Sequence, residues 1–153
     1  MKEALEEADK AFLKGEVPVG AVLVREGKII ARAHNLVETC QDATAHAEIL
    51  CLREGMRQLN NWRLVGTTLY TTLEPCTLCA GALFLSRVSC LVWGAPDTRH
   101  GANGSWVDVF SLKHPTHRVE VRTHVLSELS SEKMRLFFQK QRGRCAHSIQ
   151  RTN

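Results

Sequence analysis

Two short segments, about thirty residues apart in the chain, constrain the fold more than any other feature. The first, TAHAEIL, contains His46 and Glu48, and the second, LEPCTLC, contains Cys76 and Cys79. Residues two apart do not face each other in the body of a helix, whereas residues three apart share a face. His46 and Glu48 can therefore converge only near a helix tip, while the two cysteines can project together from one helix.

The order of apolar patterns predicts alternating helices and strands. The expected helices span residues 2–14, 45–59, 75–87 and 127–142. The expected strands span residues 19–25, 28–34, 67–73, 88–94 and 118–124, and the first two form a hairpin. Strands joined through helices pair in parallel, whereas a hairpin is antiparallel. We therefore expect one α/β domain over residues 1–153, a three-layer α/β/α arrangement with a five-stranded mixed sheet.

The connections in this arrangement bring the two segments toward one end of the sheet. Pro75 suits the first turn of the helix that carries the cysteines, directly after a strand. Asp42 or Thr44 is expected to cap the helix that follows His46. Two helix N-termini can then meet at an edge where open α/β sheets bind ligands. Their unpaired N–H groups and positive dipole ends favour cysteine thiolates over thiols.

One histidine and two thiolates form a ligand set that suits zinc. Three protein ligands, His46, Cys76 and Cys79, leave the fourth position to water, as in catalytic zinc sites. Glu48 is then a neighbouring carboxylate that does not bind the metal and can move protons. The order H-x-E…P-C-x-x-C is also a known signature of zinc-dependent base deaminases. The known signature and the chemistry of the residues therefore lead to the same assignment.

Taken alone, the cysteine motif leaves two alternatives open. A C-x-x-C pair also occurs in thioredoxin-like redox sites. A structural zinc would need a fourth protein ligand, for which His34, Cys90 and His100 are candidates. The two motifs together, in this order and at two helix starts, favour the catalytic metal.

Charge and hydropathy limit the possible partners. The net charge is +4, with acidic residues concentrated near the N-terminus and basic residues between positions 133 and 144, which mildly favours an anionic partner. No apolar run approaches the ~20 residues of a membrane span. The N-terminal segment is too acidic for a signal or transit peptide. We therefore expect an intracellular, cytoplasmic protein without a membrane partner, or an organellar one if a presequence precedes this sequence.

Beyond the zinc motifs, the chain resembles the bacterial-type tRNA adenosine deaminases of the cytidine deaminase-like superfamily. The resemblance runs from about residue 2 to residue 144, nearly the whole chain. It rests on the segments GEVPVGAVLV, HN, TAHAEI, LYTTLEPCTLCAGAL, SR, WGAPDTRHGANGS, HRVEV and FF. The zinc motifs belong to the whole superfamily, whereas GAPDTRHGANGS and the terminal FF with its following basic residues are more particular to the tRNA enzymes.

The resemblance implies a cytidine deaminase-like fold, a homodimer and one zinc ion per subunit. It also implies conversion of the wobble adenosine, position 34, to inosine in the anticodon stem-loop of a tRNA, typically the arginine tRNA with anticodon ACG. His46, Cys76 and Cys79 match the metal ligands of that family, and Glu48 matches its proton shuttle.

The resemblance also assigns residues to the substrate. Asn35 matches an asparagine that contacts the flipped nucleoside, and Val19, Leu73 and the backbone of Ala47 match the walls of its pocket. Asp97 matches an aspartate that holds the RNA near the target ribose, although a turn residue is the simpler reading of the same position.

The C-terminal segment is the third group of expected contacts. Phe138 and the basic residues after it match a contact to the anticodon loop, whereas Phe137 is expected to pack on the core. The basic residues are Lys140, Arg142 and Arg144. They are less dense than in many bacterial relatives, and Gly143 is a candidate for an early end of the helix.

The expected function is therefore hydrolytic, zinc-dependent deamination of adenosine 34 in tRNA. One alternative is a deaminase of a small base or nucleoside, such as guanine, cytosine or cytidine, which shares the zinc motifs but needs no basic tail. Another alternative is a non-catalytic, zinc-stabilised RNA-binding protein, in which Glu48 would be dispensable.

Overall fold

The computed structural model of the chain describes residues 1–149, and the side chains of residues 1–143. The helices within this part are α1 (Lys2–Leu13), α2 (Val37–Cys40), α3 (Ala47–Leu59), α4 (Thr77–Leu85) and α5 (Ser127–Ile149). The strands are β1 (Gly20–Arg25), β2 (Lys28–His34), β3 (Thr67–Leu73), β4 (Cys90–Ala95) and β5 (Glu120–Arg122). Among the described helices, none is both long and apolar enough to cross a membrane.

The strands form a single five-stranded mixed sheet in the order β2-β1-β3-β4-β5. Strand β1 pairs antiparallel with both β2 and β3, while β3, β4 and β5 run parallel. The β1–β2 turn uses Glu26 and Gly27, both with positive φ (51° and 74°), which suits the right-handed twist of a hairpin. The predicted mixed sheet is confirmed.

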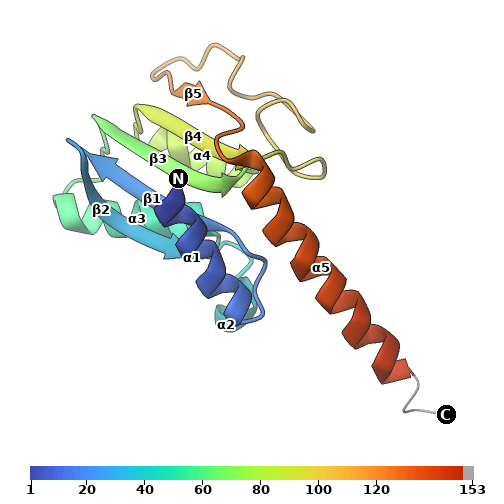
Figure 1. Cartoon of the computed structure of the whole chain (residues 1–153). Coiled ribbons are helices and arrows are strands. Elements are labelled where there is room, and N and C mark those ends of the chain that lie inside the picture. Colours follow the sequence, from blue (N-terminus) through green and yellow to red (C-terminus); the bar gives the residue numbers. More distant parts are fainter. Residues whose placement is uncertain (150–153) are drawn as a thin grey trace.

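Helices cover both faces of the sheet, which confirms the three-layer prediction (Figure 1). Helices α1 and α5 contact each other and one face, while α3 and α4 lie together on the other. The core between them contains large buried residues such as Leu23, Leu69, Leu83, Leu91 and Trp93. Burial of these side chains, at about 25 cal/mol per Å² of apolar surface, is the main stabilising contribution.

Glycine at position 20 lets α1 lie close to the start of β1. A Cβ atom at Gly20 would collide with the carbonyl oxygen of Ala4 on α1. Strand β1 is in turn covered on its other face by α3. This packing fixes the connection between α1 and β1, which includes Val19, next to the site described below.

Several details of the predicted fold differ from the structure. Helix α4 begins at Thr77 with Cys76 as its N-cap, so the prediction that Pro75 lies in the first helical turn is wrong. The short helix α2 was not predicted, because four residues cannot show a helical period. The predicted end of the last helix at residue 142 is wrong, because α5 continues through Gly143 to Ile149. A glycine in a helix interior costs only about 1 kcal/mol relative to alanine and need not end it. Strand β5 spans Glu120–Arg122, less than the predicted 118–124.

Candidate active site

The predicted metal ligands lie at two helix starts. His46 is the N-cap of α3 and Cys76 is the N-cap of α4, each with an extended backbone (ψ 148° and 175°) and no side-chain capping bond. Cys79 lies in the first turn of α4 and is buried. Because neither N-cap side chain is used to cap its own helix, both can turn toward each other beyond the helix ends.

The predicted cap of α3 is wrong. Asp42 Oδ1 accepts hydrogen bonds from the backbone N–H and the hydroxyl of Thr44, at 2.8 and 2.7 Å, so these two residues form their own turn. His46 takes the N-cap position instead. Helix α3 therefore begins two residues later than predicted, which leaves His46 outside the helix and Glu48 inside its first turn.

The three ligand atoms have the spacing of a tetrahedral zinc site. The Sγ atoms of Cys76 and Cys79 are 3.7 Å apart, and each lies 3.5 Å from His46 Nδ1. Zn–S bonds of about 2.3 Å and Zn–N bonds of about 2.0–2.1 Å at tetrahedral angles require separations of about 3.8 Å and 3.6 Å. The donor set fits zinc in both chemistry and size.

A fourth protein ligand is absent from this cluster. Among the residues whose side chains the structure describes, His46, Cys76 and Cys79 alone form a metal-ligating group of this kind. His34 instead contacts Glu7 and Lys14, at 2.9 and 3.0 Å. This arrangement favours a catalytic zinc over the structural zinc that the sequence left open.

The electrostatics of the cluster favour a bound cation. The hydrogen bond with Cys79, together with His46, lowers the pKa of Cys76 to about 4 although burial opposes the shift. The same hydrogen bond and burial raise the pKa of Cys79. The hydrogen bond with Cys76 raises the pKa of His46. One thiolate is thus already formed near neutral pH, and a divalent cation would deprotonate the second thiol.

Glu48 lies beside the metal ligands in a dry environment. Its side chain is turned into the cavity, and the residue is 4% exposed. Burial, the largest cause, raises the pKa of Glu48 to about 6. A carboxyl group with a pKa near the working pH can both take up and release a proton, which suits general acid–base catalysis.

These groups open onto a cavity of about 570 Å³, within the usual range of small-molecule sites. Of the predicted site residues, Val19, Asn35, His46, Glu48, Leu73, Cys76 and Asp97 line it. The other lining residues are Glu16, Val17, Val37, Glu38, Glu74, Thr77, His100 and Trp106. The fold therefore gathers residues from six separate parts of the sequence around the metal ligands.

Asn35 and Ala47 are joined beside this cavity. Asn35 Oδ1 accepts a hydrogen bond of 2.9 Å from the backbone N–H of Ala47, and both residues are buried. The amide NH₂ group of Asn35 remains available as a donor to a ligand. Ala47 itself is not among the lining residues of the cavity, so its part in the pocket wall stays a prediction.

Asp97 is a turn residue that also lines the cavity. Its side chain lines the cavity, and Oδ1 accepts hydrogen bonds from the backbone N–H groups of Arg99 and His100, at 3.0 and 3.3 Å. The turn reading of this residue is therefore confirmed. Its contact with RNA stays a prediction.

Glu74 is a buried residue of the site that the sequence patterns do not identify, and Glu16 is a second one. Glu74 accepts hydrogen bonds from the backbone N–H groups of Asp97 (3.1 Å), Asn103 (2.8 Å) and Ser105 (3.2 Å), and from the Ser105 hydroxyl. Glu74 therefore holds the segment 97–105 as one wall of the cavity.

Glu16 plays the equivalent part for another segment of the cavity wall. It accepts bonds from the backbone N–H groups of Glu38 (3.2 Å) and Thr39 (2.7 Å) and from the Thr39 hydroxyl (2.7 Å), and so holds α2. These bonds lower the pKa of Glu16 against the effect of burial. The only sequence signal for either anchor is its position, before Pro75-Cys76 for Glu74 and in GEVPVG for Glu16.

Replacing Glu74 by glutamine is expected to lower the free energy of unfolding by about 1–3 kcal/mol. The amide keeps the volume, but its NH₂ group would face backbone N–H groups that now donate hydrogen bonds to the carboxylate oxygens. Denaturant unfolding measures the change. Glu120→Gln is the control, since Glu120 is exposed and its pair with Arg122 lies on the surface, where such pairs contribute little. Equal stability of the two variants would contradict the anchoring role.

The C-terminal residues lie apart from the metal ligands. Phe137 is buried and its ring centroid lies 5.9 Å from that of Phe12, which confirms that Phe137 packs on the core. Phe138 is 40% exposed and lines a neighbouring hollow that also contains Asp97 and Arg99.

The C-terminal half of α5 extends away from the sheet (Figure 1) and includes Lys140 and Arg142. Lys140 lies over the ring of Phe12, with Nζ 5.2 Å from the centroid, and Arg142 is exposed. The side chain of Arg144 lies outside the described residues. The roles of Lys140, Arg142 and Arg144 in binding therefore stay predictions.

A His/Cys/Cys triad at two helix tips, a buried glutamate beside it and a mixed five-stranded sheet define a zinc-dependent hydrolase of the cytidine deaminase-like fold. Residues 1–95 match the family described as "Cytidine and deoxycytidylate deaminase zinc-binding region". The tRNA-specific adenosine deaminase of Bacillus subtilis is 51% identical over 142 residues, which cover 93% of this chain and 88% of that protein. The chain belongs to the tRNA-specific adenosine deaminases of the cytidine and deoxycytidylate deaminase family.

Two further comparisons agree. The chloroplastic tRNA(adenine(34)) deaminase of Arabidopsis thaliana is 52% identical in an alignment 155 positions long, which covers 91% of this chain but 12% of that much longer protein. A solved structure from studies of A-to-I editing by tRNA:A34 deaminases has a TM-score of 0.83 and 43% identity, and covers 87% of this chain and 96% of the other. The guanine deaminase of Bacillus subtilis is more distant, with a TM-score of 0.61 and 31% identity.

Proposed function

We propose that this protein hydrolyses the exocyclic amine of adenosine 34 in a tRNA anticodon loop and so forms inosine. The observation that carries the proposal is the site itself: Glu48, His46 and Cys76 line one cavity, and the buried Cys79 completes the ligand set with His46 and Cys76. Two relatives of the chain, each about 50% identical to it, support the choice of substrate. One is a tRNA(adenine(34)) deaminase and the other is a tRNA-specific adenosine deaminase.

The residues of the site suit this reaction. His46, Cys76 and Cys79 would hold a zinc ion, which would supply the Lewis acidity that makes water nucleophilic near neutral pH. Glu48 accepts a proton from water, donates one to the ring nitrogen next to C6, and assists the departing amine. The amide of Asn35 holds the base in the cavity. In the balanced reaction, a C6–O bond forms from water, the C6–N bond breaks and ammonia leaves.

A single-stranded loop is the form of RNA that this cavity can accept. A stacked base cannot reach a buried site, and flipping costs least where the base is unpaired. We extend the proposal to an arginine tRNA with anticodon ACG, on the basis of the family resemblance. Phe138, Lys140, Arg142 and Arg144 would contact the anticodon loop, where phosphates attract cationic side chains.

The experiment that tests the function compares substrates under identical conditions. Zinc-loaded protein is incubated with an anticodon stem-loop carrying adenosine 34, with a matched stem-loop carrying guanosine 34, and with free adenosine, guanine, cytosine and cytidine. Mass spectrometry is expected to detect inosine in the first RNA alone. Reaction of guanine or a free nucleoside without the RNA would favour the small-molecule alternative, and zinc-dependent binding without any product would favour the non-catalytic one.

We also propose that residues 1–153 act as one deaminase domain with one zinc ion, and that two copies form a homodimer. Helix α4 supports the dimer: its sequence, TLCAGALFL, contains no charged residue, yet Leu78 and Leu85 are exposed on it. An apolar face of this kind is typical of protein contacts, and twofold dimers are the commonest assembly.

The proposed location is the bacterial cytoplasm, with an organelle as the alternative in view of the chloroplastic relative.

Introducing a charge on α4 is expected to dissociate the dimer. Leu85→Glu places a carboxylate on a side chain that is 71% exposed in the single chain, and light scattering is expected to report the monomer mass. Leu13→Glu is the matched control, since Leu13 is 85% exposed at the end of α1. If both variants keep the mass of the wild type, α4 does not form the dimer contact.

A further inference from the structure

The three tryptophans of the chain have different surroundings. Trp93 is buried in the core, and Trp62 is exposed with the guanidinium of Arg63 4.1 Å from its ring centroid. Trp106 is 60% exposed and lines the cavity that contains Glu48 and the metal ligands. Single exposed apolar residues are common on protein surfaces, so the position of Trp106 on the cavity wall, rather than its exposure, is the informative observation.

The backbone at Trp106 is fixed relative to the metal ligands. Its N–H group donates a hydrogen bond of 3.1 Å to the carbonyl oxygen of Gly101. Gly101 pairs with Cys76 in an antiparallel bridge, and the N–H of Ala102 donates to the carbonyl oxygen of Pro75 at 2.9 Å. The segment that carries Trp106 is therefore attached directly to the segment that carries the zinc ligands.

Side chains hold the same segment from a second direction. The carboxylate of Glu74 accepts the hydrogen bonds of Asn103 and Ser105 described above. Trp93 Nε1 donates a hydrogen bond of 2.8 Å to Asn103 Oδ1. The backbone of Trp106 is thus held in place before a ligand arrives, and such preorganisation reduces the entropic cost of binding.

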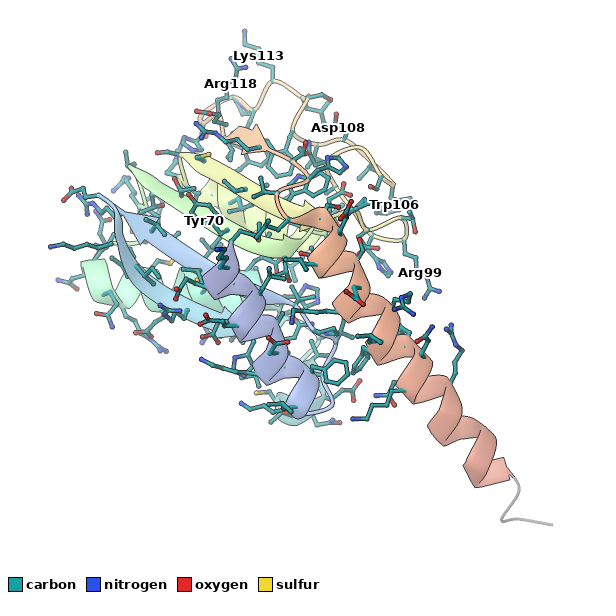
Figure 2. All side chains as sticks on the ribbon, in the orientation of Figure 1. Tyr70, Arg99, Trp106, Asp108, Lys113 and Arg118 are labelled. Carbon is teal, nitrogen blue, oxygen red and sulfur yellow. The ribbon has the colours of Figure 1, made fainter. Side chains whose placement is uncertain are left out.

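The ring of Trp106 itself is free to accept a partner. In the part of the chain whose side chains are described, no hydrogen bond, aromatic contact or cation–π contact involves this ring. Figure 2 shows Trp106 and Arg99 on the same side of the molecule, both in the long connection between β4 and β5. Aromatic faces on which bases stack and cationic side chains that attract phosphates are the two kinds of group that single-stranded nucleic acids recognise.

We propose that Trp106 stacks on the base adjacent to the target adenosine and thereby increases the affinity for an unpaired RNA loop. The inference rests on the proposed function, because it assumes that one nucleotide enters the cavity. When one base occupies the cavity, its neighbours along the strand pass over the rim, where Trp106 lies. Stacking needs no particular base, so Trp106 selects single-stranded RNA over free nucleosides without reading the sequence.

The test combines binding and kinetics on the full chain loaded with zinc. Trp106→Ala and Trp106→Phe are compared with Trp62→Ala, which removes another exposed tryptophan away from the cavity. Anticodon stem-loops carry the fluorescent base 2-aminopurine at position 33 or position 35. Trp106→Ala is expected to raise KM and Kd for the stem-loop about 5- to 150-fold, with kcat changed far less, and to abolish quenching of one of the two labels. Trp106→Phe is expected to recover most of the affinity.

Three outcomes would overturn the inference. In the first, Trp106→Ala behaves like Trp62→Ala in both KM and quenching. In the second, Trp106→Ala lowers kcat without raising KM. In the third, Trp106→Ala converts a dimer into a monomer by light scattering, which would make Trp106 a contact to a second copy of the chain. Failure of the proposed function is recognised separately, because the wild type would then form no inosine in the stem-loop even where the label is quenched.

Discussion

Glu48→Gln is expected to bind zinc and the anticodon stem-loop like the wild type while inosine formation falls by about 100- to 10,000-fold. The substitution keeps the volume of a side chain that is buried in the cavity, but the amide cannot carry a proton between water and the base. Zinc content is measured by atomic absorption, RNA affinity by fluorescence anisotropy, and inosine by mass spectrometry in single-turnover reactions.

A matched control lies on the same helix. Glu54 is on the exposed side of α3, paired with Arg57 and Gln58, outside the cavity. Glu54→Gln is expected to retain wild-type inosine formation. Full activity of Glu48→Gln would assign the proton transfer to another group. Loss of zinc in Glu48→Gln would mean that Glu48 supports the ligands, and the catalytic reading would then need a different test.

Cys79→Ser is expected to lose bound zinc and to reduce inosine formation to the level of a reaction without enzyme. Its sulfur lies 3.5 Å from His46 Nδ1 and 3.7 Å from Cys76 Sγ, so its removal breaks the tetrahedral set. A ligand that binds only the folded state stabilises it by about 2.7 kcal/mol at one hundred times its Kd. The wild type should therefore melt at a higher temperature with zinc than with a chelator, whereas Cys79→Ser should not respond.

Cys40→Ser is the control for the chemical change. Cys40 is an exposed free cysteine outside the ligand cluster, and its replacement is expected to leave zinc content, melting behaviour and inosine formation unchanged. A zinc-dependent melting shift that persists in Cys79→Ser would show that another residue completes the metal site.

The local patterns were sufficient for most of the fold. Alternation and helical spacing located every strand and four helices of the described chain, because a buried face leaves a repeating trace in the sequence. They did not locate α2, which is held by the distant carboxylate of Glu16 and has no repeat of its own. Nor did they locate the end of α5, because the cost of one glycine, Gly143, is too small to end a helix.

The metal ligands were predictable for a different reason. Cys76 and Cys79 are close in sequence, and His46 belongs to a recognisable motif, so chemistry alone identified them. Glu74 has no such motif, because a glutamate before a proline is as compatible with a surface turn as with a buried anchor. Its role depends on backbone N–H groups of Asp97, Asn103 and Ser105, more than twenty residues further along the chain.

The sequence by itself determined the kind of metal, the group that moves protons and the order of the elements, since these depend on residue types and short spacings. The tertiary structure alone decided that His46 and Cys76 occupy the N-cap positions of their helices, that Glu48 is buried enough for a pKa of about 6, and that Glu16 and Glu74 hold two segments of the cavity wall. The physical reason is that burial and long-range hydrogen bonds depend on which segments pack together. Trp106 illustrates the same point: only its place on the cavity wall distinguishes it from Trp62.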